Sequence, residues 1–333
     1  MKKHNFAYTE NISSNYAGEL ARPYVAAALL AGVTLDQRTI TVLENVKYKA
    51  NLGQIGTTNL LQDATCDFTL DSNGTVDYSE RILTPIEMQV NARLCKNDWV
   101  QQWEAVNMGA GRKDHTIAPN ISQFLLGEIA KKVAQEVEYH IWQGTDGTGT
   151  YQRFDGFVTI AEAAGTAGGF SLYEGGAGAS DATIPDLTLT GGGNPIDADD
   201  VIEVFEQFLS QVSTAVLSKE DFTIYANQKV LYALRRAQAA LGYKDDYYER
   251  QGELTSFLGY RVAPAFGLTD THIVASPASN LFFGTDLLSD HIEANVIDMA
   301  QTDGSNQIRI VMRMTGGVQV GVPSDYYAYK YEA

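Results

Sequence analysis

The stretch "ISQFLLGEIAKKVAQEVEYHIWQG", Ile121 to Gly144, contains the clearest periodic pattern in the sequence. Apolar residues recur in it at every fourth position: Ile121, Leu125, Ile129, Val133, Val137 and Ile141. This spacing aligns them along one side of a helix. The charged residues in between are expected to face solvent: Lys131, Lys132, Glu136 and Glu138. The sequence therefore predicts a long amphipathic helix over residues 119–143.

The predicted helix runs directly into a glycine-rich loop, "GTDGTGTYQRFDG" (Gly144 to Gly156). Such a loop could hold a phosphate, hold a cation, or only turn the chain. The phosphate-binding pattern G-x-x-x-x-G-K-[ST] is absent, and a dinucleotide-binding loop would follow a strand instead of a helix. Asp146 and Asp155 are too few and wrongly spaced for an EF-hand calcium loop. We therefore expect a turn, which glycine permits.

Composition excludes several classes of protein. The chain has 333 residues, of which 44% are hydrophobic, enough for one large core or two modest ones. Its 24 basic and 41 acidic residues give a net charge of −17, which argues against a surface that binds nucleic acid by neutralising phosphates. The apolar run from Val25 to Val33 is too short to span a bilayer, and its polar flank does not fit a signal peptide. A cytoplasmic protein without a membrane partner is expected.

Reactive side chains form no known catalytic or metal-binding pattern. Cys66 and Cys95 are too few for a disulfide framework, and both are expected to be buried thiols. The five histidines occur without H-E-x-x-H, and no G-x-S-x-G is present. His140 has Glu136 one helical turn before it, a pairing that is usually a surface contact. We therefore expect no catalytic residue, no metal and no cofactor, and the chain is not predicted to be an enzyme.

Strand patterns flank the long helix on its N-terminal side. Alternation from Thr39 to Leu52 predicts one strand, and residues from Gly53 to Arg93 read as a long hairpin that turns at Asn73-Gly74. A two-stranded ribbon of this kind has little core of its own. We expect a neighbouring subunit to support it.

The C-terminal half shows three kinds of segment. Residues 144–195 are glycine-rich and acidic, which predicts a flexible insertion. An α/β pattern follows from Ile196, with helices at 197–212 and 228–242 and strands at 221–227, 261–264, 271–276 and 280–285. Alternating strands between His291 and Val322 then return the chain to the first lobe. Between the helices and strands of the second lobe, "LGYKDDYYERQGEL" (Leu241 to Leu254) is either a solvated loop or an interface rich in tyrosine.

The order of these elements resembles the major capsid proteins of tailed bacteriophages, which have the HK97-type fold. The helix that ends in G-x-D-G-x-G and then an aromatic-Asp-Gly recurs in that family. The segment "NARLCKNDWVQQWEAVNMGAGR" (Asn91 to Arg112) also resembles capsid proteins of phages from Bacteroidetes-type hosts. The resemblance covers essentially the whole chain and implies an α+β fold.

The resemblance divides the chain into four parts. They are an N-terminal arm (1–45), an extended β-hairpin called the E-loop with its base (46–96), a peripheral or P-domain (97–195 and 290–333), and an inserted α/β axial or A-domain (196–289). The P-domain holds the long spine helix (119–143) and the glycine-rich insertion (144–195).

The resemblance also implies a function. Subunits of the family assemble into pentamers and hexamers of an icosahedral head around double-stranded DNA, through A-domain tips and through E-loops that lie over neighbours. The expected interface residues in this sequence are Asn73, Gly74, Tyr243, Asp245, Asp246, Tyr247 and Tyr248. The lysine, asparagine and glutamate with which some relatives crosslink their subunits cannot be matched here.

Expected partners are other copies of the chain, separate scaffolding, portal and decoration proteins, and packaged DNA in weak, non-specific contact. The expected location is the virion capsid, after assembly in the cytoplasm of a host bacterium. An encapsulin-like bacterial compartment shares the fold and remains the alternative. A cargo enzyme in place of phage DNA would distinguish it.

Overall fold

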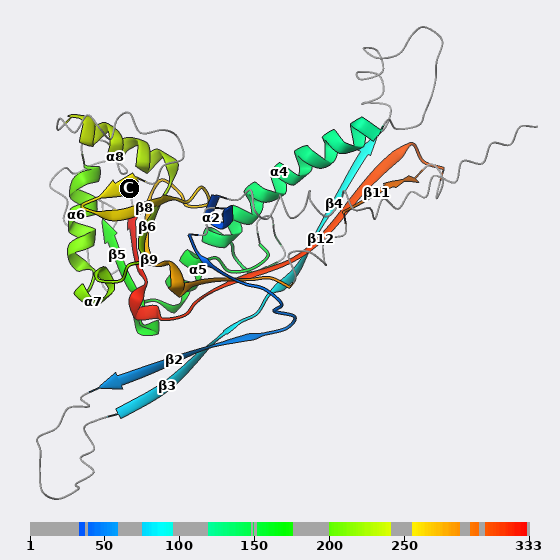
Figure 1. The fold of residues 1–333 in the computed structure, drawn as a ribbon. Coiled ribbons are helices and arrows are strands. Elements are labelled where there is room, and N and C mark those ends of the chain that lie inside the picture. Colours follow the sequence, from blue (N-terminus) through cyan, green and yellow to red (C-terminus); the bar gives the residue numbers. More distant parts are fainter. Residues whose placement is uncertain are drawn as a thin grey trace, which may run out of the picture. The chain divides into compact units, whose positions relative to one another are not determined.

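The computed structural model describes residues 33–36, 39–58, 75–95, 119–147, 149, 152–175, 200–240, 255–286, 294–299 and 304–331 (Figure 1). The predicted turn at Asn73-Gly74, the tyrosine-rich loop 241–254 and Cys66 lie outside these residues. The chain divides into two units. The smaller contains Met1–Ala27, Glu87–Ala130 and Leu288–Met314, and the larger contains Ala28–Ile86, Lys131–Leu287 and Thr315–Ala333.

A six-stranded sheet forms the centre of the larger unit. Its order is β5 (Ser171–Gly175), β13 (Tyr327–Tyr331), β9 (His272–Pro277), β6 (Phe222–Ala226), β8 (Tyr260–Pro264) and β7 (Thr255–Phe257). All five residues of β6 are buried, as in a strand covered on both faces. Helices α6 (Val201–Gln211) and α8 (Gln228–Ala240) pack against the sheet through buried residues such as Phe205 and Leu234 (Figure 1).

The helices and strands predicted from Ile196 onward are present, but one of the strands, β10 (Leu281–Gly284), pairs outside the six-stranded sheet. Strand β10 pairs in parallel with β1 (Thr41–Leu43). It also pairs antiparallel with the last part of β12 (Gln307–Val320). The strand expected over 39–52 is interrupted after β1, where Asn45 adopts a positive φ of 63°.

The expectation of a flexible insertion is wrong for residues 152–175. This segment forms helix α5 (Phe157–Ala164) and strand β5, and β5 pairs in parallel with β13. Phe157, Val158 and Ala161 are buried on one side of α5. A high glycine content misled the prediction, because several of these glycines serve particular turns, such as Gly165 (φ 58°) and Gly169 (φ 85°).

The long helix is confirmed as α4, Pro119–Gln143. In the larger unit its residues Val133, Val137 and Ile141 are buried, and Lys131 and Lys132 are exposed, as the periodicity predicts.

Two predictions for the polar residues of α4 are wrong. Glu138 is only 3% exposed, because Thr34 in helix α2 (Val33–Asp36) donates to its carboxylate from both backbone nitrogen (3.2 Å to Oε2) and hydroxyl (to Oε1). His140 is buried too, and its Nδ1 lies 2.6 Å from the backbone carbonyl oxygen of Glu136. The periodicity of a helix sequence does not reveal a hydrogen-bond partner that lies far away in the chain, as Thr34 does from Glu138.

In the larger unit, β2 (Ala50–Thr58) and β3 (Thr75–Leu83) form an antiparallel two-stranded ribbon, in which Ala50 lies opposite Leu83 and Thr58 opposite Thr75. The base of the ribbon is anchored. Leu83 is fully buried against Gly284, where an added Cβ would collide with the leucine side chain, and Gln319 Nε2 donates to the carbonyl oxygen of Ile82 at 2.9 Å.

The predicted hairpin ends sooner than expected, because β4 (Ile86–Cys95) leaves the ribbon and pairs with β12. In the smaller unit, β11 (Ala294–Asp298) pairs antiparallel with β12, from Ala294 opposite Met312 to Asp298 opposite Ile308. Cys95, expected to be buried, is exposed, because it lies on the exposed side of the alternating strand β4.

A first prediction concerns Gly267, whose backbone lies against α4. An added Cβ would collide with the carbonyl oxygen of Glu138 and lie 2.8 Å from Cδ1 of Trp142. Gly267→Ala should therefore lower the free energy of unfolding by about 1–3 kcal/mol, measured by urea denaturation. Gly56→Ala is the matched control, since the nearest atom there is 3.8 Å away. Equal stability of the two variants would contradict the packing described here.

A second prediction compares two neighbouring residues at the base of the ribbon. Leu83→Ala should lower the free energy of unfolding by about 2–5 kcal/mol, because it leaves a cavity. Ile82→Ala should cost less than about 1 kcal/mol, because that side chain is 47% exposed. Similar losses for both variants in the same denaturation experiment would show that the ribbon is not anchored through Leu83.

Candidate subunit interface

The register of the ribbon separates its side chains into two unlike faces. Residues directly opposite each other share a face, and Ile55 lies opposite Tyr78, Thr57 opposite Val76 and Asn51 opposite Ile82. We call this the apolar face, defined by Ile55, Val76, Tyr78 and Ile82. The pair Gly53–Glu80 lies on the same face between Tyr78 and Ile82, and the Glu80 carboxylate accepts a hydrogen bond from Asn51 Nδ2. The polar face carries the pairs Leu52–Arg81, Gln54–Ser79 and Gly56–Asp77.

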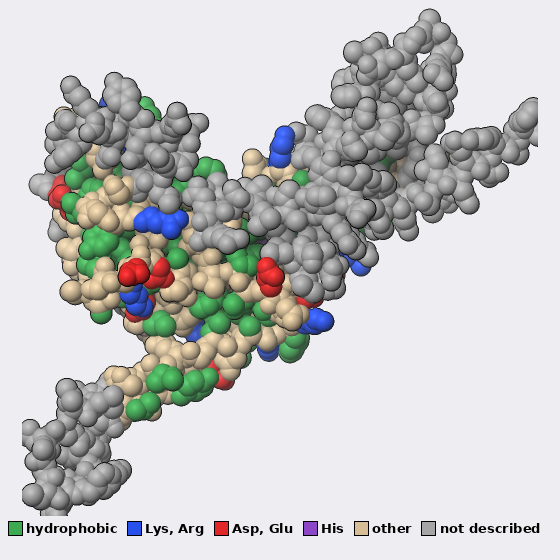
Figure 2. All heavy atoms as spheres, in the orientation of Figure 1, with side chains coloured by type: hydrophobic (Ala, Val, Ile, Leu, Met, Phe, Trp, Pro, Cys, Tyr) green, Lys and Arg blue, Asp and Glu red, His purple; other side chains and the backbone are tan. Residues whose placement is uncertain are grey.

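The apolar face is open to solvent. Ile55, Val76 and Tyr78 are 69%, 66% and 65% exposed. Figure 2 shows hydrophobic side chains along the described part of the ribbon. An added Cβ on Gly53 would lie 2.6 Å from the Tyr78 hydroxyl oxygen, so glycine leaves room for the tyrosine ring beside β2.

A surface of this kind is uncommon on a protein that works as a monomer. Soluble monomers rarely expose contiguous apolar patches, and larger ones mark interaction sites. A two-stranded ribbon is also only marginally stable in water by itself. The apolar face therefore has the properties of a docking surface for another protein.

The structure does not place the interface residues expected from the sequence. Those residues are Asn73, Gly74, Tyr243, Asp245, Asp246, Tyr247 and Tyr248, and all lie outside the described part of the chain. Sequence reasoning missed the apolar face itself. Part of its signal was present in β3, where Val76, Tyr78 and Ile82 occupy alternating positions on one side of the strand, interrupted by Glu80.

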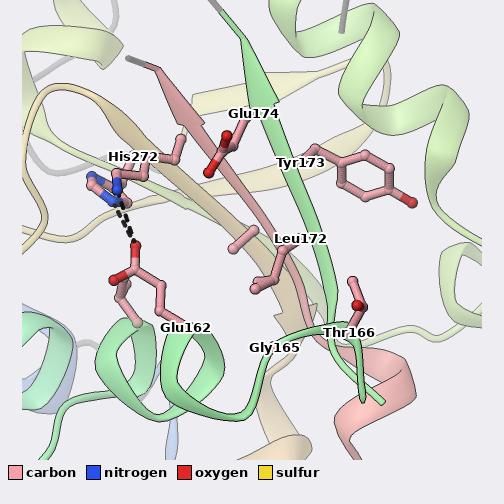
Figure 3. A pocket seen from close by; sticks show the side chains of 10 residues that line it. Glu162, Gly165, Thr166, Leu172, Tyr173, Glu174 and His272 are labelled. Carbon is pink, nitrogen blue, oxygen red and sulfur yellow. Dashed lines mark ion pairs between the residues drawn. The ribbon is translucent and has the colours of Figure 1, made fainter. Parts of the chain in front are cut away.

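A cavity of about 240 Å³ is the second candidate site in the larger unit (Figure 3). Glu162 of α5, Glu174 of β5, His272 of β9 and Lys330 of β13 line it. His272 Nε2 lies 3.5 Å from Glu162 Oε1, and Lys330 Nζ lies 3.8 Å from the same oxygen. The hydrogen bond from His272 is the main reason that the pKa of Glu162 is lowered, and Lys330 adds to it against the opposing effect of burial.

A hydroxyl, an imidazole and a carboxylate follow one another at the wall of the cavity, since Thr269 Oγ1, which does not line the cavity, lies 2.6 Å from His272 Nδ1. These are the groups that an activated nucleophile requires. The Thr269 hydroxyl, however, also accepts a bond from Gln143 Nε2 at 3.1 Å and lies 2.9 Å from the Thr271 hydroxyl. We interpret the arrangement as a network that connects α4, β9 and α5.

Among the described residues, no group of three or more histidine, cysteine, aspartate or glutamate side chains could hold a metal ion. The helices within the same residues include none with the length and hydropathy needed to cross a bilayer.

Comparison with known proteins gives structural matches only. No model of a protein family matches the chain, and no curated protein does. A chain from the procapsid of satellite phage P4, which includes the size determination (Sid) protein, is 7% identical over 95% of this chain and 92% of that one, with a TM-score of 0.58. A chain from the capsid of an empty GTA particle is 14% identical over 91% and 90%, with a TM-score of 0.54.

A third match extends over the whole chain. A chain of Mycobacterium phage Bobi is 12% identical and covers 100% of this chain and 96% of that one, with a TM-score of 0.53. At such low identity these matches establish the fold. The chain has the mixed α+β fold of HK97-type capsid proteins, as the resemblance in its sequence predicts.

Proposed function

We propose that this chain is a major capsid protein, whose copies assemble into the pentamers and hexamers of an icosahedral head around double-stranded DNA. The observation that carries the proposal is the exposed apolar face of the ribbon on a chain with a capsid-protein fold. Matches in the P4 procapsid and in the GTA capsid support it. The role is structural, and the virion capsid is its location.

The proposed division of the chain follows the resemblance. Residues 1–45 are the N-terminal arm, 46–96 the E-loop and its base, 97–195 and 290–333 the P-domain, and 196–289 the A-domain. The ribbon β2–β3 is then the E-loop. By residue number, β5 and β13 fall within the proposed P-domain. They nevertheless belong to the same sheet as the A-domain strands β6, β8 and β9.

Docking of the apolar face on a second copy would remove its side chains from water. Burial of one large apolar side chain contributes about 1.5–3 kcal/mol. Ile55, Val76 and Tyr78 would thus supply the central contact of an interface, and aromatic residues such as Tyr78 are typical of such centres. In a closed shell this contact is repeated by every subunit, so a modest gain for each copy stabilises the whole assembly.

Other partners follow from the same assignment. We propose separate scaffolding, portal and decoration proteins, and a host of the Bacteroidetes type, in whose cytoplasm assembly takes place. The net charge of −17 supports weak contact with packaged DNA.

Assembly is the decisive test. Ile55→Ser combined with Tyr78→Ser should leave the subunit folded and prevent shells from forming, because the substitutions remove the apolar face without touching the core. The matched control is Gln54→Ala combined with Ser79→Ala on the polar face, at the adjacent pair of the same ribbon. Particles are scored by gradient sedimentation and negative-stain electron microscopy.

Normal shells from the apolar-face variant would overturn the proposed interface. Shells that contain an enzyme and no DNA would favour the encapsulin-like compartment. A wild-type chain that is never found in particles would contradict both functions.

A further prediction concerns DNA. Purified subunits should show negligible binding to duplex DNA at physiological salt, because affinity depends on the number of phosphates neutralised by basic side chains. A gel-shift titration measures this. Clear retention at micromolar protein would contradict it.

A further inference from the structure

The sheet of the smaller unit has one face that is open to solvent. Strands β4 and β11 both pair with β12 (Figure 1). Along β12, buried and exposed residues alternate, since Ile308 and Ile310 are buried whereas Arg309 and Arg313 are exposed. Residues at alternate positions of a strand share a face. Both arginines therefore lie on the open face.

A groove of about 610 Å³ lies on this sheet. Its lining combines two arginines, Arg93 of β4 and Arg309, with three apolar residues, Ile297, Met299 and Val311. We call it the arginine groove, defined by these five residues. Arg93 is exposed. All five residues belong to the smaller unit.

The groove concentrates positive charge on a chain whose net charge is −17. Among the described residues that line it are two arginines and no acid. Asp298 of β11 lies opposite the buried Ile308, at a register position of the other face. On the Arg93 side of β4, the first acid is Glu87, roughly 20 Å along the strand. Charge complementarity therefore favours a partner that is negative where it makes contact.

The apolar residues of the groove decide which kind of anion fits. Met299 is 6% exposed, and Ile297 and Val311 are half-buried. A nucleic-acid backbone has phosphate oxygens for the arginines but no apolar side chain for these residues. A peptide in which acidic and large apolar residues alternate supplies both. Its carboxylates accept paired hydrogen bonds from guanidinium groups, and its apolar side chains are removed from water.

We infer that the arginine groove is a docking site for a peptide segment of another protein, in which acidic and apolar residues alternate. Arg93 and Arg309 bind the carboxylates of this segment, and the apolar residues of the groove contact its apolar side chains. Arg313, on the same face of β12, adds to the attraction. The inference goes beyond the proposed function and does not rest on it, since the whole groove belongs to one subunit.

Fluorescence anisotropy of two labelled peptides with the full-length chain tests the groove. Both peptides contain the same number of glutamates, separated by leucine in one and by serine in the other. The Glu-Leu peptide should bind about tenfold more tightly or better, because the burial of one leucine side chain is worth at least this factor. Its affinity should also fall as salt is raised, because exposed charges are screened.

Two variants separate the groove from general charge effects. Arg93→Glu combined with Arg313→Glu should weaken binding of the Glu-Leu peptide by about tenfold or more, because attraction becomes repulsion. Lys132→Glu combined with Arg236→Glu is the matched control. It changes the net charge equally at two exposed residues of the larger unit, and binding should stay within about twofold of the wild type.

Equal affinities of the wild type and the groove variant would overturn the inference. So would a wild-type chain that binds neither peptide or binds both equally, results that need no variant to fold. A short DNA duplex bound as tightly as the Glu-Leu peptide would overturn it in favour of nucleic acid. Self-association that the groove variant abolishes would overturn it in favour of a second copy. Peptide binding is measured without shells, so the inference and the proposed function fail independently.

Discussion

The larger unit is organised around the burial of one tryptophan. Trp142 is fully buried near the end of α4, with its ring centroid 4.9 Å from that of Tyr225 in β6 and 5.5 Å from that of Phe157 in α5. Its Nε1 donates to the hydroxyl oxygen of Thr34 in α2. Aromatic side chains bury large areas in preferred geometries, so this one residue joins the end of α4 to β6, α5 and α2.

That packing explains why the ribbon can be so different from the rest of the unit. Around Trp142 the apolar side chains face one another within the chain, whereas beyond Leu83 the ribbon presents Ile55 and Tyr78 to water. The ribbon joins this packed core at its base, through the fully buried Leu83. Its exposed residues Ile55, Val76 and Tyr78 make no such contribution to the core.

Local patterns in the sequence predict what depends on local spacing. The limits of α4 and the elements α6, β6 and α8 follow from apolar periodicity. The burial of Glu138 could not be predicted, because its hydrogen-bond partner Thr34 lies far away in the chain. Strand β13 was missed because "YAYKY" at Tyr327–Tyr331 has no distinctive flanks, and its place is set by β5 and β9. The apolar face was visible only in β3, since Ile55 is the one large apolar residue that β2 contributes to this face.

The position of β13 has a consequence for how the protein is made. Ser171 of β5 pairs in parallel with Tyr327 of β13, and β13 separates β5 from β9 within the sheet. While the ribosome is still adding residues 287 to 331, β5 and β9 are both complete and both lack this neighbour. Their open edges are surfaces on which nascent chains can pair wrongly. The complete six-stranded sheet thus exists only after translation has passed Tyr331.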